Sequence, residues 1–204
     1  MDIVVVSDVE VCNLAFNGRL AELQDKIAQI TRQLNTTDQD GKVALHYAIE
    51  AVVMEQIDID VCENIVEFLL DRGANPNVTD RNGQTPLMLA VWTGMQKVVS
   101  LLVDHFSFLI GDHLNIVDSD GRSALIYAVK TYSPDPQIVA ALVHLSHTCR
   151  LNRPLTRRDV LLRDNDGRTA LSYAAEPRCP IEIGLMILDF YLIPVCLITC
   201  GPSC

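Results

Sequence analysis

The chain has 204 residues, of which 49% are hydrophobic and 21% charged, a balance typical of a folded globular protein. Its formal net charge of −10 argues against binding to DNA or RNA, because phosphate backbones require clustered Lys and Arg side chains. The N-terminal residues lack a basic region, and the apolar stretch 181–199 contains Glu182, Asp189 and Pro194. We therefore expect no nucleic-acid partner, no signal peptide, no membrane span, and a cytoplasmic location, with a nuclear one possible.

Four segments of eleven residues align along the chain without gaps. They are DQDGKVALHYA from Asp38, DRNGQTPLMLA from Asp80, DSDGRSALIYA from Asp118 and DNDGRTALSYA from Asp164. Each segment starts with Asp, has Gly at its fourth position and ends on Ala. Self-similarity at this spacing predicts a repeat array.

Each segment predicts a tight turn followed by a helix. Glycine at the fourth position supplies the positive φ that the tip of such a turn needs, and the preceding Asp can bond turn amides. Thr85, Ser123 and Thr169 stand where a helix N-cap belongs, and Pro86 stands at a first helical position. Val43 breaks this capping pattern in the first segment.

A second helix is predicted after each first one. In Val61–Leu70 an apolar stripe is formed by Ile65, Val66, Leu69 and Leu70. The same pattern predicts helices at Lys97–Val103, Ile138–Leu145 and Ile181–Leu188. Each repeat is therefore expected to be a pair of helices.

The segments and the helices that follow them resemble the ankyrin repeat family. Its signature is a β-turn and two helices around a T-P-L-H-x-A core, matched best here by NGQTPLMLA at Asn82–Ala90. The resemblance implies an all-α fold, a solenoid of stacked helix-turn-helix units with short β-turn or hairpin connections. LAFNGRL at Leu14–Leu20 resembles part of one further, earlier repeat.

On this resemblance the array covers residues 1–191. We expect five repeats at 7–37, 38–79, 80–117, 118–163 and 164–191, followed by an apolar, cysteine-containing tail at 192–204. The repeats are longer than is usual in the family, and we expect the extra residues to form surface loops. The insertions are at 50–60, 107–113, 131–136 (TYSPDP) and 146–160.

Metal, cofactor and catalytic motifs fail when tested against this sequence. The three Asp-x-Asp-Gly matches lack the Glu that a calcium loop needs six residues after its Gly. Neither His144-x-x-His147-x-Cys149 nor the cysteines at 196, 200 and 204 form the Cys-x-x-Cys pairs of a structural zinc site. Most of the seven cysteines lie in apolar runs, which favours buried, reduced thiols. We expect no metal, no cofactor and no enzyme activity.

The resemblance implies a partner-binding surface formed by the turn tips and the first helix of each repeat. Its positions correspond here to Lys42, Arg81, Gln84, Trp92, Thr93, Arg122, Lys130 and Arg168. Two alternatives weaken this assignment: Trp92 could pack against a neighbouring helix, and the cations could be neutralised by the acidic residues of their own turns. Tyr47, Tyr127 and Tyr173 share a frame position with Leu89 and are expected to be packing residues.

The expected function is non-catalytic binding of another protein, as a scaffold or adaptor. The partner is not identified by the sequence, although an acidic peptide suits the cations better than a nucleic acid does. The chain is expected to be monomeric or part of a larger complex. Two alternatives are a regulatory subunit that inhibits an enzyme or a transcription factor, and a metal- or redox-responsive module that uses the C-terminal cysteines.

Overall fold

The computed structural model describes residues 7, 9–26, 32–106, 116–148 and 160–192. Within these ranges the chain forms ten helices in five consecutive pairs, and no residue lies in a strand. The pairs are α1 (Glu10–Phe16) with α2 (Leu20–Asp25), α4 (Ala44–Val53) with α5 (Ile59–Asp71), α6 (Pro86–Trp92) with α7 (Gln96–Phe106), α8 (Ala124–Lys130) with α9 (Pro136–Thr148), and α11 (Ala170–Ala174) with α12 (Ile181–Leu192). The predicted all-α fold of paired helices is confirmed.

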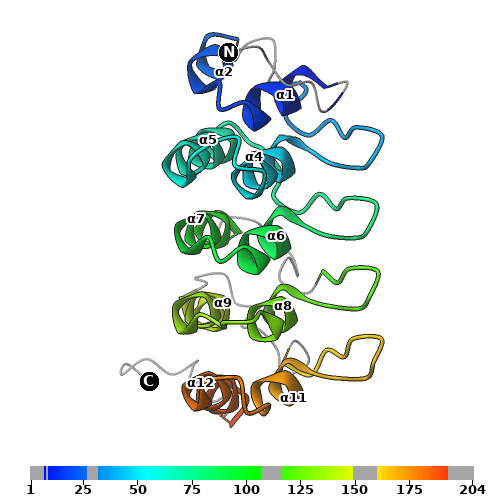
Figure 1. Ribbon diagram of the computed structural model, residues 1–204, viewed down its shortest axis with the longest axis vertical. Coiled ribbons are helices and arrows are strands. Elements are labelled where there is room, and N and C mark those ends of the chain that lie inside the picture. The colour runs from blue at the N-terminus through cyan, green and yellow to red at the C-terminus, as the bar shows by residue number, and fades with distance from the viewer. Residues whose placement is uncertain (1–6, 8, 27–31, 107–115, 149–159, 193–204) are drawn as a thin grey trace, which may run out of the picture.

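The pairs are stacked in a single column, and the loops that precede four of the first helices project from one side of it (Figure 1). The first helices form an inner row, in which α1 packs on α4, α4 on α6, α6 on α8, and α8 on α11. The second helices form an outer row, in which α2 packs on α5, α5 on α7, α7 on α9, and α9 on α12. Each repeat therefore buries its apolar side against its neighbours along the column.

The core lies between the two rows of helices. The predicted stripe of α5 is buried, and the alanines that end the four aligned segments (Ala48, Ala90, Ala128 and Ala174) are buried in the inner row. Small side chains at these positions let neighbouring helices approach closely. Leu125 and Leu171 are only partly buried, whereas the equivalent Leu45 and Leu87 are fully enclosed.

The inner helices α6, α8 and α11 begin directly after the predicted capping residues. The hydroxyls of Thr85, Ser123 and Thr169 accept hydrogen bonds from the amides of Met88, Ile126 and Ser172, at 3.2 to 3.4 Å. Val43 has no such group. There the His46 amide donates to the Val43 carbonyl at 2.9 Å, and the Nδ1 atom of His46 accepts a hydrogen bond from the Val43 amide at 3.2 Å.

The outer helices are longer than predicted. In α9, the carboxylate of Asp135 accepts a hydrogen bond from the Gln137 amide at 2.8 Å, so this helix begins two residues earlier than the apolar pattern indicates. The insertion at 50–60 is partly helical, because α4 continues to Val53. The insertion predicted at 107–113 lies outside the described residues, as do residues 149–159 of the insertion predicted at 146–160, residues 193–204 of the tail predicted at 192–204, and residues 1–6.

Neighbouring turns are hydrogen-bonded to one another through their backbones. The amides of Arg81, Ser119 and Asn165 each donate to a carbonyl of the preceding turn at 2.8 Å. The turn glycines have φ near +75°, as predicted. A Cβ atom on Gly83 would lie 3.0 Å from the Cα of Asp118, whereas one on Gly167 would meet no atom within 4 Å. Gly83 therefore needs both its positive φ and the absence of a Cβ atom, whereas Gly167 needs only the positive φ.

These two glycines provide a matched test of how closely the turns are stacked. Gly167→Ala should lower the free energy of unfolding by roughly 1 kcal/mol, the cost of a left-handed backbone in a residue with a Cβ. Gly83→Ala should cost at least about 1 kcal/mol more, since the neighbouring turn must also move. Urea unfolding followed by circular dichroism measures both values. Equal losses would contradict the close approach at Gly83.

Candidate partner-binding surface

A turn aspartate holds each projecting loop in shape. In the repeat that starts at Asp118, one carboxylate oxygen accepts the amides of Asp120 and Arg122 at 2.9 and 2.8 Å. The other oxygen accepts the hydroxyl of Tyr127 from helix α8 at 2.6 Å. Asp38 with Tyr47, and Asp164 with Tyr173, make the same arrangement. Asp80 also accepts two turn amides, but the position of the tyrosine is occupied there by Leu89.

The three tyrosines therefore do more than pack. Their rings are buried, as expected, while their hydroxyls join the turn to the inner helix. Burial raises the pKa of Asp164, but the hydrogen bonds from the Tyr173 hydroxyl and from the amides of Arg168 and Asp166 outweigh it, so the pKa is lowered. Burial and the bond to Asp164 raise the pKa of Tyr173. The carboxylate stays charged and the phenol neutral, which fixes the direction of the bond.

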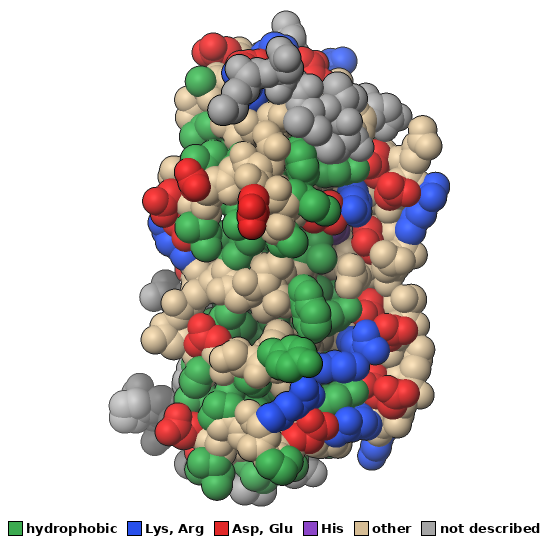
Figure 2. All heavy atoms as spheres, viewed as in Figure 1, with side chains coloured by type: hydrophobic (Ala, Val, Ile, Leu, Met, Phe, Trp, Pro, Cys, Tyr) green, Lys and Arg blue, Asp and Glu red, His purple; other side chains and the backbone are tan. Residues whose placement is uncertain are grey.

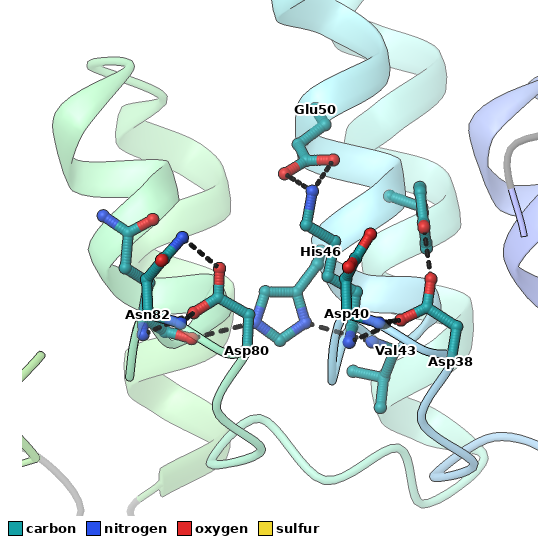
Figure 3. A network of polar contacts seen from close by, with 10 residues as sticks. Asp38, Asp40, Val43, His46, Glu50, Asp80 and Asn82 are labelled. Carbon is teal, nitrogen blue, oxygen red and sulfur yellow. Dashed lines mark hydrogen bonds and ion pairs between the residues drawn. The ribbon is translucent and has the colours of Figure 1, made fainter. Parts of the chain in front are cut away.

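His46 joins two repeats from a completely buried position (Figure 3). Its Nδ1 atom accepts from the Val43 amide, and its Nε2 atom donates to the carbonyl of Gln84 at 3.1 Å. These two bonds require the neutral ring. Burial lowers the pKa of His46, and this effect exceeds the opposing ones of the Gln84 carbonyl and of Asp80. The residue was missed as an inter-repeat contact, although it occupies the histidine position of the ankyrin signature.

Most of the candidate cations are paired within the chain. The Lys42 ammonium lies 2.6 Å from a carboxylate oxygen of Glu50, and Arg168 pairs with Glu176. Arg122 pairs with Asp120 at 2.5 Å, and Arg81 with Asp40 at 3.2 Å. Arg122 thus pairs within its own turn, as the alternative interpretation held. Arg81 pairs with the preceding turn, whereas Lys42 and Arg168 use glutamates of their inner helices.

Lys130 is different from the other candidate cations. Its ammonium lies 5.2 Å from the centre of the Tyr173 ring in the next repeat. It makes no ion pair with any residue that the structure describes. Lys130 ends helix α8 and is half-buried, so its charge is only partly covered by the next repeat.

Gln84 and Thr93 are engaged in the fold. The side-chain amide of Gln84 donates to the Tyr127 hydroxyl at 2.8 Å, which links two repeats. The Thr93 hydroxyl donates to the carbonyls of Leu89 and Ala90 at the end of α6. Both side chains therefore hold the surface in place, whatever contacts they make with a partner.

Trp92 lies at the edge of a hollow between α6, α8 and the start of α9. Its ring meets the Tyr127 ring edge to face, with the centres 5.9 Å apart, yet 54% of the residue stays exposed. Trp92 therefore packs on a neighbouring helix, as the alternative held, and also presents surface to solvent. The hollow has a volume of about 240 Å³ and is lined on its other side by Thr131 and Tyr132.

Tyr132 is 97% exposed and was missed by the sequence analysis. It belongs to the insertion TYSPDP, and an aromatic residue in a polar loop was the signal that could have found it. Figure 2 shows hydrophobic side chains over the helices of this face, with Lys, Arg, Asp and Glu side chains gathered along the projecting loops. The surface thus combines exposed aromatic area with a border of charges.

The described thiols are not reactive groups. Cys12, Cys62 and Cys179 are buried, and burial raises the pKa of Cys62 to about 12. The side chains of His144, His147 and the cysteines at 149, 196, 200 and 204 lie outside the described part of the chain. Within that part, no three His, Cys, Asp or Glu residues are grouped so as to hold a metal. The described helices also include none with the length and hydrophobicity needed to cross a membrane.

Comparison with known proteins identifies the repeat. A family model for ankyrin repeats matches residues 58–155 in three copies. The chain is an ankyrin repeat protein. Repeats of this family are generally protein-binding modules and are typically not catalytic. The family resemblance found in the sequence is therefore confirmed.

Several ankyrin proteins share a part of this chain. The 26S proteasome non-ATPase regulatory subunit 10 of Rattus norvegicus is 42% identical over 81 residues, which are 40% of this chain and 31% of that protein. An Escherichia coli (strain K12) ankyrin repeat protein is 34% identical over 86 residues, 42% of this chain and 41% of that one. The human transient receptor potential cation channel subfamily A member 1 is 32% identical over 112 residues, 54% of this chain and 9% of the channel. This chain thus matches less than half of each of these relatives.

The buried imidazole should make stability depend on pH. Because the folded state lowers the pKa of His46 below its ordinary value near 6.5, the unfolded state binds more protons as the pH falls. The stabilisation from neutral His46 is complete above about pH 6.5 and is lost below it, at up to about 1.4 kcal/mol per pH unit. We expect the stability advantage of the wild type over His46→Gln to shrink between about pH 7 and pH 5. Urea unfolding at each pH measures it, and a constant difference would contradict the assignment.

The tyrosine hydroxyls can be tested with one substitution at two sites. Tyr127→Phe removes the bonds to Asp118 and Gln84 but keeps the ring under Trp92, and should cost about 1–2 kcal/mol of unfolding free energy. Tyr132→Phe, at an exposed position, should leave stability unchanged. Thermal unfolding compares the two variants. Equal stability of both would show that the bond between turn and helix contributes little.

Proposed function

We propose that this ankyrin repeat protein binds another protein on the surface formed by its projecting turns and inner helices, and that it catalyses no reaction itself. The observation that carries the proposal is the exposure of Trp92 beside Tyr132, on either side of a hollow in that surface. Tryptophan and tyrosine dominate the energetics of protein interfaces. Two large aromatic residues left open to solvent next to a cavity are typical of a contact site.

The rigidity of the surface supports the same proposal. Tyr127, against which Trp92 packs, is bonded to Asp118 and Gln84, and Thr93 is bonded to the backbone of α6. A partner would therefore meet a surface that is already ordered, which reduces the entropy lost on binding. The eight candidate residues stay a prediction of this surface, of which Trp92 and Lys130 have the strongest structural support.

The alternatives have less support. An inhibitory subunit would use the same surface, so the effect of this chain on a partner's activity would separate it from an adaptor. The redox alternative depends on cysteines at 196, 200 and 204, which lie outside the described residues. A cytoplasmic or nuclear location, the repeat boundaries and a monomeric state also stay predictions.

We expect the aromatic pair to be necessary for partner capture. A chain carrying Trp92→Ser and Tyr132→Ser should retain at most about a tenth of the partner bound by the wild type, a loss of about 1.4 kcal/mol or more. Co-purification from cells that express the protein, with mass spectrometry, identifies the partner, and titration with the purified partner gives the affinity. Circular dichroism checks that the variant is folded.

Ile59→Ser provides the control for this experiment. Ile59 begins the outer helix α5 and is 45% exposed, so its substitution removes exposed apolar surface from the opposite row. This variant should bind the partner as the wild type does. Undiminished capture by the double variant, or an equal loss in the control, would argue against a binding site at the hollow.

A further inference from the structure

The repeats share a pair of positions, one on the turn and one on the inner helix, and a single copy carries cations at both. The residue after the turn glycine and the residue two positions beyond the helix alanine are eight apart in all four segments: Lys42 and Glu50, Gln84 and Trp92, Arg122 and Lys130, Arg168 and Glu176. In the first and last copies this is an ion pair between turn and helix. In the copy between Asp118 and Lys130 both members are cations.

The missing acid leaves positive charge uncompensated. Arg122 turns instead to Asp120 of its own turn, and its Nε atom is buried without a hydrogen-bond acceptor. The Lys130 ammonium lies 5.2 Å from the centre of the Tyr173 ring, and its charge helps to lower the pKa of Asp164 without forming an ion pair with it. In the next repeat, Glu176 already pairs with Arg168 and with Arg178. In a protein with a net charge of −10, Lys130 thus makes no ion pair within the described residues, whereas the equivalent pairs of the two neighbouring repeats carry no net charge.

The unpaired cation adjoins the aromatic hollow. Lys130 is followed directly by Thr131 and Tyr132, which line the hollow, and Trp92 faces them from the preceding repeat. Asp135 also lines this cavity, but its carboxylate accepts the Gln137 amide at the start of α9. A hollow lined by two aromatic residues therefore adjoins, along the chain, a lysine that makes no ion pair within the described residues.

We infer that the partner presents an acidic segment, in which Asp or Glu stands close to a large apolar residue. The apolar side chain enters the hollow between Trp92 and Tyr132. The carboxylate approaches Lys130 and Arg122 and supplies the charge that Glu50 and Glu176 supply in the other repeats. This inference rests on the proposed function and specifies the chemistry of the partner. A nucleic acid is disfavoured, since the remaining cations of this surface are already paired.

A selection for binding peptides tests this inference without knowledge of the natural partner. The full-length protein is immobilised and presented with a random twelve-residue peptide library. We expect the recovered peptides to be enriched in Asp or Glu next to Leu, Phe or Trp. Recovery of mainly basic or uncharged peptides, or no enrichment at all, would overturn the inference.

The affinity of a recovered peptide is then measured in solution. Trp92 is the only tryptophan, so its fluorescence reports binding directly, and tryptophan-free peptides keep the signal unambiguous. Replacement of the acidic residues of the peptide by Gln or Asn should weaken binding at least tenfold. An unchanged affinity would exclude recognition of the carboxylates.

Lys130→Glu separates binding from folding. It restores the acid found at this position in two other repeats, so it should pair with Arg122 and leave the melting temperature unchanged or higher. Peptide affinity should nevertheless fall at least tenfold. Lys130→Gln, which removes the charge without adding an acid, should give an intermediate loss and covers the case in which the glutamate variant fails to fold. Unchanged affinity in a folded variant contradicts the inference.

Two controls distinguish failure of this inference from failure of the proposed function. Lys97→Glu makes the same charge change on outer helix α7, where Lys97 pairs with Glu63, and should not alter peptide affinity. Peptides that require Trp92 but bind Lys130→Glu normally would overturn the acidic partner and leave the binding surface intact. Peptides whose affinity depends on neither Trp92 nor Lys130 would overturn both the acidic partner and the proposed binding surface. Binding of a random-sequence RNA that is lost in Lys130→Glu would replace the protein partner by a nucleic acid.

Discussion

The arrangement of this protein depends on one carboxylate in each turn. Its first oxygen holds two amides of the turn, and in three repeats its second oxygen accepts a tyrosine hydroxyl from the inner helix. Without this bridge the projecting loop and the helix behind it would be joined only by a few backbone residues. With it, residues on the turn and residues at the end of the helix keep a constant separation. In the repeat of Trp92, where Leu89 takes the place of the tyrosine, the Gln84 side chain on the turn instead donates to the Tyr127 hydroxyl of the next repeat.

The binding surface belongs to no single repeat. Trp92 comes from one repeat and packs on Tyr127 of the next, which Gln84 of the first also holds. Amide-to-carbonyl bonds between turns and the buried His46 provide similar links along the column. Stability in such an array is the sum of each repeat and its contacts with its neighbours. A hollow between two repeats therefore exists only when both are folded and stacked, which couples partner binding to the integrity of the array.

Local chemistry was enough to predict the fold but not the whole site. Turn glycines, capping residues such as Thr85 and apolar stripes such as that of α5 act over a few residues, so their meaning can be found in the sequence. The role of His46 depends on the Gln84 carbonyl, which is 38 positions away, and the exposure of Tyr132 depends on how a loop lies against another repeat. The choice of partner for Lys42 likewise required coordinates, since Asp40 and Glu50 are both within reach in the sequence. The sequence thus could not specify contacts between repeats, nor which of several nearby acids a cation pairs with.

The variation at one frame position shows how an array can change its partner without changing its fold. Glu50, Trp92, Lys130 and Glu176 occupy the same place at the end of an inner helix, and none of them belongs to the buried core. The alanine two positions earlier is buried in every copy, in helices that pack on their neighbours in the array. Packing therefore restricts the alanine position to a small residue, while the position two residues later can hold a carboxylate, an aromatic ring or an ammonium group. Where this position carries an acid, a cation of the turn pairs with it. Trp92 and Lys130 have no such pairing with their own turns. They come from adjacent repeats, so both can contact the same partner.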